Sequence, residues 1–428
     1  MHTSFLLKWT FSGKIIQMGL IGLLSVFGAR VGFSQTKADE YLLISNKLNI
    51  NRDKEVICVN KNDFASIPVH SYPLLKQGNK VCISQLVDED MDGQWDELLV
   101  EVSIKALAKD KIAVIWIKKV DYPNFEKATN IRFSLKSKTQ QPEKEINYLE
   151  RQRGFTQNIA NPAYQMEGPG IENDKIAFRS FFDKRNGKDI YGKLMATPVL
   201  DEVGLTGSWH TLQSWGMDIL RTGNSLGAGA LGVKQQGKIF RLADADNTTF
   251  KALYEGPLKA CYKLDFTNWD VAALLKNGTE QLSITRGDYF YFNQVKLNLA
   301  ESQHLISGMA NFGTNPFVYK KHNKKFSSVS LYGPQADGTQ TKLGLAILFQ
   351  ANQYAGHATT LAADSIPNTS YIALKPVKKE MNSLRFFACW EKTDTMFSTK
   401  EGFEKYLQET ADRLANPIEI TVIQHTKK

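Results

Sequence analysis

The side chains best suited to chemistry gather in one block of the sequence, between Glu167 and Val233. Its first half contains the stretch RSFFDKRNGKDIYGK at residues 179–193, which is rich in cations, carboxylates and a phenol. Such a set can bind an anion through charge-assisted hydrogen bonds, but a solvated strand face would have the same composition. The side chains concerned are Arg179, Asp183, Lys184, Arg185, Lys188, Asp189, Tyr191 and Lys193.

Arg179 is the most informative of these cations. In the run IAFRSFF, the alternation of a strand places Arg179 between apolar neighbours on its own face. An unpaired cation in such a setting costs free energy, so Arg179 needs either an internal carboxylate or an anionic ligand. The internal partners available nearby are Glu172, Asp183 and Asp189, and both interpretations remain open at this point.

The second half of the block contains SWHTLQSWGMD, with His210 between Trp209 and Trp215 and followed by Asp218. Imidazole is the side chain best matched to proton transfer near neutral pH, and indole rings can stack on sugars. We therefore expect His210 in a ligand site, although a lone His is more often a packing residue. The next stretch, GNSLGAGALG, lacks the P-loop Lys and the Rossmann glycine spacing, so it predicts tight turns and close backbone packing.

A separate acidic turn precedes the block, in DEDMDGQWDELLVEV at residues 88–102. Asp88, Asp90, Asp92 and Asp96 supply hard oxygen ligands around a glycine, the arrangement that Ca²⁺ requires. The spacing and the following strand pattern exclude an EF-hand. The alternative is an Asp-Gly hairpin turn without an ion, and in either case the role is structural. We expect no organic cofactor.

Strands must position these residues, because short runs rich in β-branched and aromatic side chains dominate the chain. Helical patterns occur only at residues 270–278 and 401–416. A polar stretch near residues 127–147 divides a small N-terminal β domain, 35–145, from a large β-sandwich domain with a C-terminal helix, 146–428. The four cysteines lie in apolar runs without metal-ligand spacing. Cys58 and Cys82 could pair if their strands are neighbours, and buried free thiols are the alternative.

The first 34 residues have the order of a signal peptide: basic residues, a short apolar run and small residues before Gln35. This predicts export to the periplasm or the outside, with a single signal-anchor helix as the alternative. The net charge is +9, which favours acidic partners weakly and without specificity. In that compartment the expected partner is an acidic glycan, and we expect no nucleic acid and, after signal cleavage, no membrane; the oligomeric state is left open.

Four stretches resemble a family of exported bacterial proteins classified as a domain of unknown function and often encoded in polysaccharide-utilisation loci. They are DGQWDELLVEV, EGPGIENDKIAFRSFFDKRNGKDIYGK, WGMDILRTGNSLGAGALGV and YEGPLKACYKLDF. The resemblance implies a carbohydrate context, with glycans rich in uronic acids. In addition, YEGPLKACYKLDF together with SITRGDYFYFNQVKL is similar to the β-supersandwich of galactose-mutarotase-like domains, which recurs in polysaccharide lyases. The fold class expected is therefore mostly β with few helices.

These observations predict a carbohydrate-active enzyme, and most strongly a lyase. In β-elimination a cation neutralises the uronate carboxylate and a base removes the C5 proton. Arg179 and Arg185 could serve the first role, and His210 or Tyr191 could act as base or acid. The expected substrate-binding residues are Glu172, Lys184, Asp189, Trp209, Trp215 and Asp218. The alternatives are hydrolysis by paired carboxylates, drawn from Glu172, Asp189 and Asp218, and glycan binding without catalysis.

Overall fold

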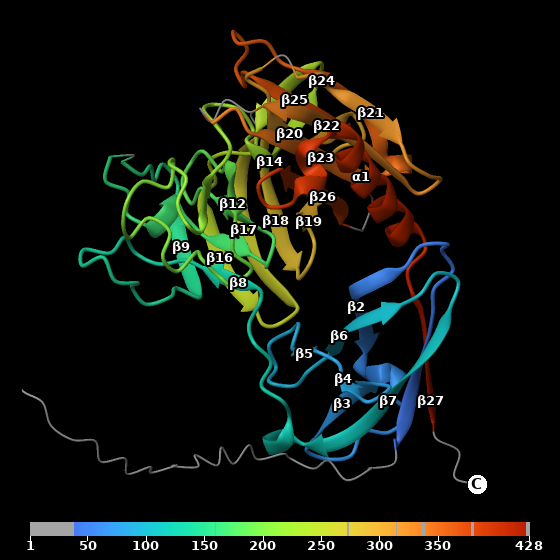
Figure 1. Cartoon of the computed structure of the whole chain (residues 1–428). Helices are drawn as coiled ribbons and strands as arrows, with labels where there is room; N and C mark the ends of the chain where they lie inside the picture. Colours follow the sequence, from blue (N-terminus) through green and yellow to red (C-terminus); the bar gives the residue numbers. More distant parts are fainter. Residues whose placement is uncertain are drawn as a thin grey trace, which may run out of the picture. The chain divides into compact units, whose positions relative to one another are not determined.

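The computed structural model describes residues 38–424, except residues 159, 272–273, 314, 335–338 and 378–380. The described residues from 38 to 424 belong to one compact unit (Figure 1). The predicted signal peptide, residues 1–34, lies outside the described residues. None of the helices in the described ranges is long and apolar enough to span a membrane.

The N-terminal strands β1 to β7, together with the C-terminal strand β27, form two antiparallel sheets. One has five strands in the order β27-β1-β7-β3-β4, and the other has three in the order β2-β6-β5. Alternate side chains of these strands, such as Leu42, Val100 and Val114, meet in one buried cluster, as expected for strands with one apolar face. The bounds are β1 Glu40–Ser45, β2 Arg52–Asn60, β3 Ser71–Gln77, β4 Lys80–Val81, β5 Ser84–Val87, β6 Glu97–Ile104, β7 Lys109–Lys118 and β27 Glu419–Gln424.

The rest of the chain is built from a nine-stranded antiparallel sheet, β21-β22-β23-β26-β19-β18-β17-β16-β9, and two five-stranded sheets, β13-β12-β11-β10-β8 and β15-β14-β20-β25-β24. All three sheets contribute to one buried cluster. In this cluster the rings of Phe178 and Tyr291 pack edge to face, with their centroids 4.8 Å apart. The sheets therefore pack as a sandwich. The bounds are β8 Asn130–Arg132, β9 Tyr148–Gln152, β10 Gly170–Glu172, β11 Ile176–Ser180, β12 Lys188–Lys193, β13 Gly216–Asp218, β14 Ala228–Gln235, β15 Lys238–Arg241, β16 Asn247–Tyr254, β17 Lys259–Val271, β18 Leu274–Thr285, β19 Phe290–Leu297, β20 Gln303–Ala310, β21 Val318–Lys321, β22 Phe326–Pro334, β23 Lys342–Gln350, β24 Tyr354–Thr359, β25 Thr369–Leu374 and β26 Asn382–Trp390.

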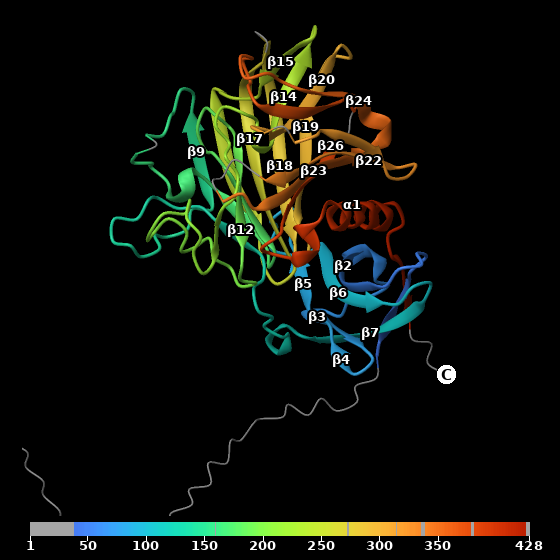
Figure 2. The same ribbon diagram turned by 45° about the horizontal axis from the view of Figure 1, so that its top comes forward.

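The predicted C-terminal helix is confirmed as α1, Lys400–Ala415, which lies against strands of the nine-stranded sheet (Figure 2). The Thr399 side chain caps it by accepting a hydrogen bond from the Gly402 N–H at 3.1 Å. One apolar face, with Phe403, Leu407 and Ala411, is buried against the sheet. This burial supplies most of the stability of such a helix.

The mostly β class is confirmed, but the predicted helix at residues 270–278 is wrong. Its described residues belong to a hairpin of β17 and β18, in which Asp270 pairs with Leu275. The reason is tertiary: Trp269 is buried and stacks on Phe266, with ring centroids 3.7 Å apart, and this packing overrides a short helical pattern. The apolar pattern was too short to distinguish a helix from a strand.

The structure also bears on the expected cysteine pair and on the expected domain division. All four cysteines are free thiols, so the suggested Cys58–Cys82 pair is not formed. The division at residues 145 and 146 stays a prediction, but the last strand does not remain in the C-terminal part, because β27 pairs with β1 along its whole length.

Candidate functional site

Strands β11, β12 and β13 bring the predicted site residues together. Their antiparallel register places Arg179 opposite Asp189, and Tyr191 opposite Asp218. Because Asp189 and Tyr191 are two residues apart on β12, these four side chains share one face of the sheet. The sequence alternation therefore predicted the face of Arg179 correctly.

Arg179 is enclosed by carboxylates instead of facing an open anion site. Its side chain is buried, with 3% of its surface exposed. The guanidinium Nη2 lies 2.7 Å from Asp189 Oδ2 and 3.6 Å from Asp218 Oδ2, and Nη1 lies 3.9 Å from Glu167 Oε1. Nη1 also donates to the Met166 carbonyl at 3.2 Å. The internal ion pair with Asp189, one of the two interpretations left open above, is therefore formed.

The carboxyl groups of Asp189 and Asp218 influence each other's pKa. Burial raises the pKa of Asp189, while Arg179 opposes that rise. Burial, followed by the negative charge of Asp189, raises the pKa of Asp218 well above its usual value. Two adjacent carboxylates beside one cation cannot both ionise easily, so we infer that Asp218 carries the proton of the pair.

We call Glu167, Arg179, Asp189 and Asp218 the Arg179 cluster. His210 forms the solvent-facing side of this cluster, which we call the His210 edge. Its side chain is 69% exposed, and Nδ1 lies 3.5 Å from Asp218 Oδ2. The loop is fixed because the Asp218 N–H donates to the Trp209 carbonyl at 2.8 Å. Partial burial, and then the charge of Arg179, lowers the pKa of His210. The ring of half-buried Trp209 lies 5.7 Å from the His210 ring, and half-buried Trp215 packs against Tyr191 behind it.

Tyr191 lies behind this edge, in the interior. It is fully buried, and its hydroxyl has no hydrogen-bond partner among the described residues. Burial raises the pKa of this phenol well above its usual value, which keeps it protonated. In this structure the hydroxyl is not placed to reach a substrate.

Arg185 and Lys184 differ in their surroundings. Arg185 is partly exposed and pairs with Asp183, Nη2 to Oδ2 at 2.6 Å, and with Glu167. Its guanidinium lies over the Phe181 ring at 4.2 Å. Lys184 is exposed and makes no ion pair within the described ranges. Only Arg185 is therefore coupled to the Arg179 cluster, through their shared neighbour Glu167.

Glu172 lies apart from the His210 edge and is fully buried. One carboxylate oxygen is 2.5 Å from the Nζ of Lys193, which is also buried. The other oxygen accepts from the Val199 and Leu200 N–H groups, both at 2.9 Å. Its lone pairs are used within the protein, so the structure does not bring Glu172 into contact with a glycan.

Glu167 is the member of the cluster that the sequence reasoning missed. It connects Arg179 and Arg185, and it lies in left-handed backbone, with φ 63° after Met166 at φ 54°. Strained backbone of this kind occurs often at functional sites. A signal was present in the EGPG sequence: a Cβ on Gly168 would lie 2.1 Å from the Ser180 carbonyl, so only glycine allows this approach.

The glycine-rich loop after Asp218 serves close packing, as predicted. Gly227 has φ 60°, and a Cβ there would lie 2.1 Å from the Lys188 carbonyl oxygen. The loop borders a cavity of about 160 Å³ that also touches Arg185 and Arg241. Arg241 donates to the Asn224 and Ser225 carbonyls at 2.6 and 2.7 Å, so these backbone groups already occupy much of its guanidinium.

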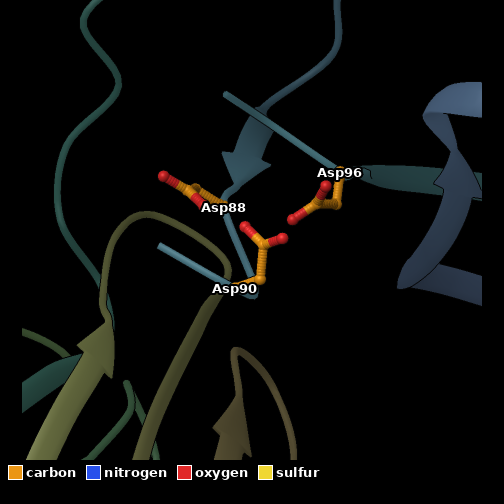
Figure 3. A group of neighbouring side chains, drawn as sticks. All are labelled: Asp88, Asp90 and Asp96. Atoms are coloured by element: carbon orange, nitrogen blue, oxygen red, sulfur yellow. The ribbon is translucent and has the colours of Figure 1, made fainter. Parts of the chain in front are cut away.

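The acidic turn brings three of its four predicted ligands together (Figure 3). One carboxylate oxygen from each of Asp88, Asp90 and Asp96 lies within 4.8 Å of the others. Asp92 is turned away from them and accepts from the Gln94 N–H at 2.7 Å. Asp88 also accepts from the Gly93 N–H at 2.8 Å, so the same carboxylates stabilise the turn itself.

The chain belongs to the family described as "Domain of unknown function (DUF4861)", whose sequence profile matches residues 44–420. It is 20% identical over 416 residues to "Uncharacterized protein P7" of Formosa agariphila, covering 91% of this chain and 94% of that protein. Among solved structures, it is similar to an alpha-mannosidase from Enterococcus faecalis V583, with TM-score 0.46 and 10% identity over 91% of this chain and 46% of that one. A glycosyl hydrolase family 38 protein from Enterococcus faecalis gives TM-score 0.47 and 11% identity over 91% and 48%. The chain thus spans about half the length of these two structures.

Proposed function

We propose that this DUF4861 protein is an exported carbohydrate-active enzyme that cleaves uronic-acid-containing glycans by β-elimination. The observation that carries the proposal is the exposed imidazole of His210, which lies 3.5 Å from the buried Asp218 carboxyl group. An imidazole that removes a proton from carbon must be unprotonated and accessible at the working pH. His210 meets both conditions.

The neighbours of His210 fit the remaining needs of elimination. The base removes the C5 proton, the electron pair forms the C4–C5 double bond, and the C4–O bond breaks to release the leaving sugar, whose oxygen takes up a proton. The buried, protonated Asp218 lies 3.5 Å from His210 Nδ1 and can orient the imidazole without adding a second negative charge. Trp209 and Trp215 provide ring faces on which a sugar can stack.

Hydrolysis is the second candidate, and the carboxylates favour it less. The two acids of a glycosidase flank the bond at a separation of about 5–9.5 Å. Asp189 and Asp218 instead lie beside the same guanidinium group, and Glu172 is enclosed with Lys193. Binding without catalysis would use the same tryptophans but would not need the imidazole.

Product analysis separates these reactions. The protein would be incubated with a panel of acidic oligosaccharides, and the products would be identified by mass spectrometry. Hydrolysis adds one water to the sum of the product masses, whereas elimination adds none. We expect fragments without added water. Fragments that carry the water, or intact substrate across the whole panel, would contradict the proposal.

The pH profile follows from the environment of His210. Its pKa is lowered below 6.5 by burial and by Arg179, so the imidazole stays in the basic form down to a lower pH than a free His. We expect the acidic limb of kcat/KM to fall below pH 6.5. The check is the rate over a pH series with buffer controls. A limb centred above that value would mean that His210 is not the base.

We also propose that the acidic turn binds Ca²⁺ in a structural role. Calcium that binds the folded state alone raises the melting temperature by mass action. We expect a chelator to lower the Tm of the wild type and to leave an Asp88→Asn, Asp90→Asn double variant unchanged. The exposed Asp121→Asn variant serves as the matched control and should respond as the wild type does. A wild-type Tm that is the same with calcium and with chelator would contradict the proposal that the turn binds Ca²⁺.

A further inference from the structure

A cavity lined by described residues that do not include His210 has a volume of about 530 Å³. Its walls come from β2, the β18–β19 turn, β19, β26 and α1, all of which belong to the compact unit. Six Lys and Arg residues and five Asp and Glu residues line it. We call it the Arg385 cavity. Its size falls in the range of sites for small ligands.

Arg385 is a cation of this cavity that stacks on an aromatic ring and forms no ion pair with a carboxylate of the described residues. It lies opposite Phe292 in the pairing of β26 with β19, and its guanidinium stacks over that ring at 4.4 Å. No carboxylate of the described residues lies within the 4.0 Å limit of an ion pair. Arg385 is partly buried, and this burial lowers its pKa to about 10. Stacking covers one face of the guanidinium and leaves its N–H edge available.

Arg413 of α1 also lines the cavity without an ion-pair partner in the described chain. Its Nη2 donates to the Thr410 hydroxyl at 3.1 Å. Two other cations in the same walls are paired: Arg286 lies 3.6 Å from Glu101 and Lys175 lies 3.6 Å from Asp174. Two arginines that form no ion pair with a carboxylate of the described residues can bind an anion through charge-assisted hydrogen bonds.

Asp288 supplies a group whose charge changes near neutral pH. It lies on the β18–β19 turn in the cavity wall, and burial raises its pKa to about 7 against the attraction of Arg413 and Arg385. An anion bound beside it would favour its protonated form. The cavity can therefore lose a negative charge when it takes up a negative ligand.

We propose that the Arg385 cavity binds an anionic sugar, with Arg385 and Arg413 contacting its acid group. The acid group is a carboxylate or a sulfate, since both offer oxygens to guanidinium N–H donors. A sugar fits better than an inorganic anion because the walls also provide acceptors for hydroxyl groups, among them Asp53 and Ser283. None of the lining residues belongs to the His210 edge, so this binding is separate from the proposed catalysis.

Calorimetric titration of the signal-free protein tests the proposal, with D-glucuronate, glucose 6-sulfate and glucose as probes. We expect at least one of the two anions to bind and glucose to bind more weakly; the tighter anion identifies the acid group. Arg385→Gln should weaken binding about tenfold to a hundredfold, the effect of losing a charge-assisted contact. Arg221→Gln is the matched control, because Arg221 also stacks on a phenylalanine, Phe312 at 4.9 Å, and does not line the cavity.

Two further measurements keep the result separate from catalysis and from folding. His210→Ala should bind the anion as the wild type does, and Arg385→Lys should recover part of the affinity if charge is what matters. Affinity should also fall as the pH rises through about 7, where Asp288 loses its proton. The charged groups that face Asp288 are Arg385 of β26, Arg413 of α1, Glu55 of β2 and Asp174 of the β10–β11 turn.

The proposal is overturned by any of three results. The first is a wild type that binds neither anion. The second is a folded Arg385→Gln variant that binds as tightly as the wild type. The third is glucose that binds as tightly as the anions.

Discussion

Replacing Lys193 by methionine should lower the free energy of unfolding by about 3–5 kcal/mol, the effect of leaving one partner of a buried ion pair without the other. Lys193 is 1% exposed, and its Nζ contacts a carboxylate oxygen of Glu172 at 2.5 Å. It also donates to the Asn173 carbonyl at 2.6 Å. Without the ammonium group, the fully buried Glu172 must either remain charged or take up a proton. Denaturant unfolding followed by fluorescence measures the loss.

A matched lysine provides the control. Lys175→Met removes an ion pair with Asp174 at 3.6 Å whose lysine side chain is 35% exposed, so it should change the free energy of unfolding by less than about 1 kcal/mol. Adding Glu172→Gln to Lys193→Met should recover part of the loss, because no buried charge is then left alone. If Lys193→Met alone unfolds within that same small margin of the wild type, the buried pair does not stabilise the fold.

Replacing His210 by alanine should lower kcat by about a hundredfold or more, the contribution of a general base that transfers a proton in the rate-limiting step. The side chain is mostly exposed, so the fold should not change, and the melting temperature should match that of the wild type. Substrate binding should change little, because Trp209 and Trp215 stay in place. Steady-state kinetics on an acidic oligosaccharide measures both parameters.

An exposed histidine elsewhere is the control for this variant. His357 of β24 lies among aromatic rings, and its Nδ1 is 2.8 Å from the Tyr354 hydroxyl. His357→Ala therefore also removes an exposed imidazole from aromatic surroundings, at a position far in the sequence from the Arg179 cluster. It should keep wild-type kcat. Equal losses in the two variants would mean that the effect on His210→Ala is not specific to proton transfer.

The sequence predicted those features that depend on local pattern. The alternation in IAFRSFF gave the face of Arg179, and helical spacing gave the C-terminal helix, whose cap and apolar face are both local. The choice between an ion pair and a ligand for Arg179 was not local. It depended on Asp189, which faces Arg179 because β12 pairs with β11, and on Asp218, which reaches the same place because β13 pairs with β12.

The Arg385 cavity could not have been predicted from the sequence. Its residues come from segments more than a hundred positions apart, such as Asp288 on the β18–β19 turn and Arg413 on α1. They meet because β26 inserts between β19 and β23 in the nine-stranded sheet. Non-local strand pairing of this kind leaves no sequence motif. Arg385 in the run SLRFFACWEK therefore cannot be told from an ordinary strand residue by sequence alone.

The most direct test of the central claim is ultraviolet absorbance, because only elimination creates the conjugated double bond of an unsaturated uronate. Wild-type protein and the His210→Ala variant would be followed on the same acidic oligosaccharides, with reducing ends measured in parallel. We expect absorbance and reducing ends to rise together for the wild type and to rise at least about a hundredfold more slowly for the variant. Reducing ends without absorbance, or equal rates for the two proteins, would contradict β-elimination by His210.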